Sequence, residues 1–171
     1  MALTKKSFAA CLLIGVALTS GSLASNDAKI TALPDAHDVR NIILGFHGLN
    51  IDTYAPITEA AILTSGCVYA TEPGSDKNEA LMKILQDGIQ VSDRGSFRFR
   101  LRTVVSIQLH DHSSLRLLIS DAHNRKPGVY GTVDNESHGT EGYLSSSEAL
   151  LITLRAWAKN NLRARNPSPF C

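Results

Sequence analysis

The sequence predicts an α+β domain in which an antiparallel sheet of about four or five strands packs against two helices. Residues 97–109 alternate between apolar and polar side chains, as a half-buried strand does. Two other segments, one central and one C-terminal, repeat apolar residues at helical spacing. A small barrel capped by a helix also fits this pattern, and the sequence leaves both architectures open.

The strands are expected to form a meander. A short polar loop separates residues 97–109 from residues 115–120, which predicts an antiparallel hairpin. Residues 129–133 follow a Pro-Gly turn and would add a third strand. Residues 39–46 are apolar and rich in β-branched side chains, so they form a strand or a short helix, and residues 57–70 suit a turn of helix followed by a buried strand.

The central helix is predicted over residues 77–87. Asp76, followed three residues later by Glu79, resembles a capping box at its start. Gly88 can supply the left-handed conformation that ends many helices. These end signals and the helical spacing of the apolar residues between them predict the same helix.

A second capping box, Ser145 and Glu148, predicts the start of the C-terminal helix. Three cations, Lys159, Arg163 and Arg165, stand where the helix dipole favours positive charge. Residues 134–142, which precede this helix, are expected to be the longest polar loop of the domain.

Residues 1–24 have the order of a secretory signal peptide: Lys5 and Lys6, an apolar run, and small residues before a cut after Ala24. Removing them from 171 residues leaves 147, residues 25–171, a common size for one domain. The 17 Lys and Arg fall to 15, against 16 Asp and Glu. This near-neutral charge does not favour a nucleic acid as partner, and we expect no membrane span in the mature chain.

Cysteine usage predicts a disulfide. Cys11 would leave with the signal peptide, so the exported chain keeps Cys67 and Cys171. Because exported proteins meet oxidising conditions, we expect these two thiols to pair. A reactive thiol at Cys67 is the alternative, but the sequence around it has no C-x-x-C spacing.

Arginines alternate along the long strand and suggest a binding face. Arg98, Arg100 and Arg102 share one side of an extended segment, and Arg116 lies on the predicted hairpin partner. Several guanidinium groups on one sheet face could bind carboxylates, phosphates or an acidic protein surface. The alternative is an ordinary solvated face.

Two histidines form a candidate metal site. His110 and His112 are two residues apart, which on a strand places both imidazoles on one side, and Asp121 and His123 follow one strand later. The expected hairpin register does not bring these groups together, so an exposed polar tip explains the same residues.

Residues 42–48 end in His47-Gly48 and resemble the strand and oxyanion loop of α/β-hydrolases. The resemblance implies hydrolase chemistry near His47. It covers seven residues only, and no G-x-S-x-G motif, which would hold the nucleophile, follows in the chain.

Taken together, the residues favour an exported, non-catalytic binding protein, such as an inhibitor, immunity-type or accessory protein that acts on a protein partner. The reasons are the missing catalytic set, the missing cofactor fingerprint and the small disulfide-bonded scaffold. We expect no cofactor. One alternative is a small secreted hydrolase or metal-dependent enzyme that uses His47, His110 or His112. Another is a subunit of a secreted or surface assembly, because the sequence does not indicate the oligomeric state.

Overall fold

The structure, a computed structural model, describes residues 33–48, 56–92, 101–120, 129–135, 140–146, 148–166, 168 and 171. Within these residues, seven strands form one antiparallel sheet in the order β2-β1-β4-β5-β6-β7-β3. The predicted α+β class is therefore confirmed, with more strands than the expected four or five. Because β2 and β3 are the two ends of this order, the described sheet is open and is not the closed barrel considered above.

The strands are β1 (Val39–Phe46), β2 (Cys67–Ala70), β3 (Ile89–Ser92), β4 (Leu101–Leu109), β5 (Ser114–Ser120), β6 (Val129–Asn135) and β7 (Thr140–Ser146). The helices are the 3-10 turn η1 (Ala36–Asp38), α1 (Glu59–Ser65), α2 (Asp76–Gly88) and α3 (Glu148–Asn161). The predicted meander is present as β4, β5 and β6 and continues into β7.

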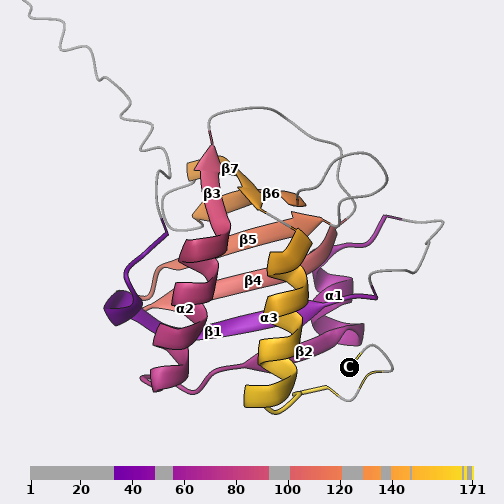
Figure 1. The fold of residues 1–171 in the computed structure, drawn as a ribbon, viewed down its shortest axis with the longest axis horizontal. Coiled ribbons are helices and arrows are strands. Elements are labelled where there is room, and N and C mark those ends of the chain that lie inside the picture. The colour runs from indigo at the N-terminus through magenta and orange to yellow at the C-terminus, as the bar shows by residue number, and fades with distance from the viewer. Residues whose placement is uncertain are drawn as a thin grey trace, which may run out of the picture.

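Helices cover the sheet on both faces (Figure 1). α2 and α3 lie side by side across one face and enclose the larger core. The buried residues that β5 and the second half of β1 contribute to this core alternate along each strand, as the pleat requires: Ile42, Leu44, Phe46, Leu115, Leu117 and Ile119. Val39 also joins this core, on the other side of a register shift in β1. α1 closes a smaller core on the opposite face, where Ile62 packs with Leu101 and Val104. The sheet is thus the middle layer of three.

The predicted central helix is present as α2, but its ends differ from the prediction. Ser75, in extended conformation, is the N-cap, and its Oγ accepts a hydrogen bond from the Lys77 amide at 3.2 Å. The expected cap, Asp76, is already helical. Gly88 is not in the left-handed region, which Gly74 adopts with φ 70°. A Cβ on Gly88 would lie 2.5 Å from Leu150 Cδ1, so this glycine permits the close packing of α2 on α3.

The prediction of a long polar loop over residues 134–142 is wrong at both ends of this range. β6 continues to Asn135 and β7 begins at Thr140, which pairs with Asn135. Sheet hydrogen bonds join backbone groups, so polar side chains do not stop a strand at this position. Ser145 lies within β7, paired with Tyr130, and cannot cap the C-terminal helix, which begins at Glu148.

Several expectations concern parts of the chain outside the described residues. The interpreted signal peptide, residues 1–24, is one of them, and the beginning of the long strand, residues 97–100, is another. Among the described residues, no helix combines the length and the apolar character needed to cross a bilayer.

Candidate binding groove beside the disulfide

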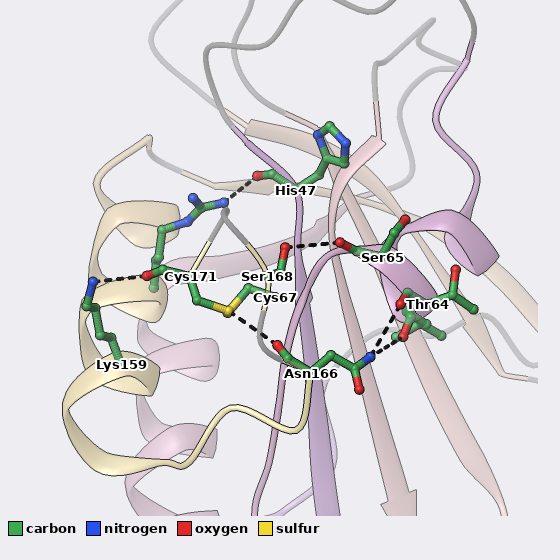
Figure 2. Close-up of a disulfide and its surroundings, with 10 residues drawn as sticks. His47, Thr64, Ser65, Cys67, Lys159, Asn166, Ser168 and Cys171 are labelled. Atoms are coloured by element: carbon green, nitrogen blue, oxygen red, sulfur yellow. Dashed lines mark hydrogen bonds between the residues drawn. A yellow bond between two sulfur atoms is a disulfide. The ribbon is translucent and has the colours of Figure 1, made fainter.

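The C-terminal tail, of which residues 162–166, 168 and 171 are described, lies beside β2, and a disulfide joins it there (Figures 1 and 2). Cys67, the first residue of β2, is buried, whereas Cys171 is exposed. The two Cα atoms are 5.1 Å apart, and the bond closes a span of 104 residues. The predicted pairing is therefore present.

Backbone hydrogen bonding also holds the tail against β2. Ala164 forms an antiparallel bridge with Tyr69, and the Arg165 amide donates to the Val68 carbonyl at 2.6 Å. β2 is the outer strand on this side of the sheet, so the tail supplies backbone partners to an edge. Three further side-chain bonds fix the tail: Asn166 Nδ2 to the Leu63 carbonyl (3.3 Å), Ser168 Oγ to the Ser65 carbonyl (3.1 Å), and Lys159 Nζ to the Cys171 carbonyl (2.9 Å).

Arg155 connects α3 to the residue that follows β1. Its Nη2 donates to the His47 carbonyl, and its Cζ lies 5.2 Å from the centre of the Phe46 ring. Phe46 in turn meets Tyr69 edge to face, with ring centres 6.0 Å apart. Burial lowers the pKa of the Arg155 guanidinium, and Tyr69 acts in the opposite direction. These contacts tie α3, β1 and β2 into one unit beneath the tail.

Arg102 does not lie on an exposed face, contrary to the sequence prediction. The residue is only 1% exposed, and its Nη1 is 3.4 Å from His47 Nδ1. The register of β4 against β5 shifts between Leu101 and Thr103, and this extra residue breaks the strict alternation on which the prediction depended. Leu101 consequently packs with Val104 in the smaller core.

The other three predicted arginines also give no exposed row among the described residues. Arg116 is half-buried, and its Nη1 donates to Glu59 Oε2 of α1 at 3.2 Å. Arg98 and Arg100 lie outside the described residues, so their role stays a prediction. The described part of the sheet therefore offers no cluster of free guanidinium groups on this face.

His110 and His112 lie at the tip of the β4–β5 hairpin, and both are exposed. Asp111 Oδ1 accepts from the Ser113 amide at 2.8 Å, and His112 has φ 69°, so the segment is a tight turn. The two imidazoles do not share one side of a strand as predicted. Asp121 and His123 lie outside the described residues.

The described residues contain one group of three potential metal ligands, and neither of the predicted histidines belongs to it. The group is Asp35, His37 and Asp38, whose ligating atoms lie within 4.8 Å of one another. All three side chains are exposed on one short turn, which by itself does not define a metal site.

His47 stands at the other end of β1 from His110. Phe46, just before His47, pairs with Thr103, whereas Val39 pairs with Leu109, just before His110. β1 is also antiparallel to both of its neighbours, whereas its counterpart in an α/β-hydrolase belongs to a mostly parallel sheet. The hydrolase resemblance of residues 42–48 is therefore not supported by the fold.

A groove of about 840 Å³ opens between the tail and the start of α2. Its cations are Lys77 on α2 and Arg163 and Arg165 on the tail, and its carboxylate is Glu72. All four residues are exposed. We call this site the basic groove.

Two of these cations were predicted only as residues that complement the dipole of the last helix. Because α3 ends at Asn161, Arg163 and Arg165 lie beyond it, on the segment that bridges to β2. The sequence signal that could have located these cations is two arginines on either side of one small residue, shortly before a paired cysteine. It indicates a segment tethered to the sheet rather than another helical turn.

The fold and the groove define a small three-layer α+β protein with a disulfide-tethered tail. No protein-family model, no curated protein and no solved structure matches the chain. The function must therefore be argued from the residues.

Proposed function

We propose that this chain is an exported, non-catalytic binding protein that acts on a protein partner through the basic groove. One observation carries the proposal: a tail fixed by a disulfide and several hydrogen bonds forms one wall of a charged groove. A binding surface held rigidly loses little conformational entropy when a partner binds, which favours affinity. The disulfide supports the export part of the proposal, because a disulfide requires oxidising surroundings to persist.

The enzyme alternative has less support from the described residues. His110 and His112 occupy an exposed turn, and His47 lies at the far end of β1 from them. In the described part of the chain, these histidines therefore do not line one common cleft. General acid–base catalysis needs its groups within hydrogen-bond reach of one substrate.

Site-specific photo-cross-linking tests the proposal. A photo-reactive amino acid in place of Arg163 stands on the groove wall, and the same amino acid in place of Lys83 stands on an exposed part of α2 away from the groove. In the exporting host, we expect a discrete protein adduct from position 163 alone. The adduct partner, once purified, should bind the oxidised chain at fixed stoichiometry.

Other outcomes count against the proposal. If neither position gives an adduct, or if both give the same adducts, the groove does not select a partner. If the adduct at position 163 is a second copy of this chain, the alternative of a self-assembling subunit is favoured instead.

A further inference from the structure

The charges of the basic groove indicate what kind of partner it fits. At neutral pH, Lys77, Arg163 and Arg165 contribute three positive charges and Glu72 one negative charge, so this lining has a net charge of +2. The whole exported chain is nearly neutral, with 15 Lys and Arg against 16 Asp and Glu once residues 1–24 are removed. The groove is therefore a local concentration of positive charge.

The two arginines of the groove are available to a ligand. Neither guanidinium has a hydrogen-bond or ion-pair partner within the part of the chain that the structure describes. Lys77 is partly engaged, because its Nζ donates to the Asn161 carbonyl at 2.7 Å. The exposed Arg163 and Arg165 therefore carry most of the capacity to bind an anion.

The backbone around Ala164 sets the spacing of these arginines. Ala164 bridges to Tyr69 and packs against the larger core, whereas the residues on either side of it are exposed. Arg163 and Arg165, on either side of this bridge, both line the groove, and residues two apart along a strand-like segment lie roughly 6–7 Å from each other. An extended ligand with carboxylates on alternate residues has the same spacing. Each guanidinium can accept one carboxylate in a bidentate pair.

The size of the groove and the charge of its surroundings further restrict the ligand. A volume of about 840 Å³ suits a peptide segment rather than one small inorganic anion. On the other side of Ser75, a second pocket is lined by the carboxylates of Asp35, Asp76 and Glu79. The second pocket repels negative charge on a ligand. The carboxylates of the ligand must therefore lie toward the arginines of the tail.

We propose that the basic groove binds an extended acidic segment of a partner protein, with carboxylates on alternate residues that pair with Arg163 and Arg165. This inference rests on the proposed function, because it names the chemistry that the partner must present.

A peptide titration followed by NMR tests the inference on the full exported chain with its disulfide formed. The probe is acetyl-Ala-Glu-Ala-Glu-Ala-Glu-amide. A second peptide has the same composition with its three glutamates adjacent, and a third has lysine in place of each glutamate. We expect saturable shifts of the Lys77, Arg163 and Arg165 amides with the first peptide, weaker binding of the second, and none with the third.

Variants separate groove binding from general attraction between charges. Replacing Arg163 and Arg165 with glutamate should weaken binding of the alternating peptide by at least about tenfold, whereas Lys83→Glu, which removes an exposed cation elsewhere on α2, should change it less than twofold. The inference is overturned if the double variant binds the peptide as the unmodified chain does, if Lys83→Glu is equally damaging, or if inorganic phosphate competes as well as the peptide.

The inference can fail while the proposed function stands. In that case the partner identified by cross-linking would bind the double variant Arg163→Glu, Arg165→Glu with unchanged affinity, which shows a protein partner that does not use these charges. Failure of the proposed function is different, because no partner would then be found at position 163 at all.

Discussion

A Cβ atom on Gly66 would lie 2.4 Å from the carbonyl oxygen of Ile62 and 2.6 Å from that of Phe46. Gly66 is the buried residue that joins α1 to β2, directly before the disulfide cysteine. Both obstructing atoms belong to the backbone, so a rotamer change cannot make room for a side chain. The close approach of α1 to the end of β1 therefore requires glycine at this position.

Gly66→Ala should lower the free energy of unfolding by about 3 kcal/mol or more, because overpacking against backbone atoms cannot relax locally. Gly74→Ala is the matched control: Gly74 has φ 70° but nothing within 4 Å of the added Cβ, so it should cost only about 1 kcal/mol. Urea denaturation of both variants checks the order. Equal losses would contradict the steric explanation.

A buried hydroxyl continues the pairing of β1 beyond the end of β2. Thr71 Oγ1 accepts from the Ile42 amide at 2.8 Å, and the Thr71 amide donates to the Ile42 carbonyl at 3.0 Å. Thr71→Val keeps the shape but leaves a buried amide without its acceptor, which should cost about 1–3 kcal/mol. Thr71→Ser keeps the hydroxyl and should cost less. Thermal or urea unfolding measures the stability of both variants. If the serine variant is less stable than the valine variant, this role of the hydroxyl is refuted.

The sequence predicted the elements whose signals are local. The strands that alternation predicted are present as β4 and β5, the helices that helical spacing predicted are present as α2 and α3, and the two remaining cysteines pair. Each of these signals depends on a periodicity or on a count, and neither requires knowledge of distant neighbours.

The sequence predictions failed where contact with a neighbouring element determines the structure of a residue. The register shift next to Arg102 depends on how β4 meets β5, and this single irregularity converts an expected surface residue into a buried one. Ser145 has the sequence of a helix cap but pairs with β3 and β6. The basic groove could not be predicted because Lys77 and Arg163 meet only through the packing of α2, α3 and the tail.

The burial of Arg102 predicts a large stability effect where the sequence alone predicted a small one. Arg102→Met removes the polar contact with His47 and replaces a fully buried guanidinium, so it should cost on the order of 2–4 kcal/mol. Arg163→Met, at an exposed position, should change stability by less than about 0.5 kcal/mol. A chemical denaturation curve of each variant provides the comparison. A near-neutral Arg102→Met would show that the contact is dispensable.

The same burial restricts how binding can be tested. Charge reversal at Arg102 would place a carboxylate inside the protein, so any loss of partner binding would follow from unfolding. Arg98 and Arg100 remain testable separately, and the variants of the basic groove, being exposed, do not have this problem.

The disulfide and the β2 edge predict local release of the tail upon reduction. The double variant Cys67→Ala, Cys171→Ser should lose about 2–4 kcal/mol of stability, because the bond closes a span of 104 residues in the unfolded chain. The Arg165 amide, bonded to the Val68 carbonyl, should then exchange its hydrogen faster than amides in the centre of the sheet. Native-state hydrogen exchange measures both groups in one experiment. If the Arg165 amide keeps its protection relative to the central strands, then the backbone bridge at Ala164 and the side-chain bonds hold the tail without the disulfide, and the rigidity of the groove does not depend on Cys171.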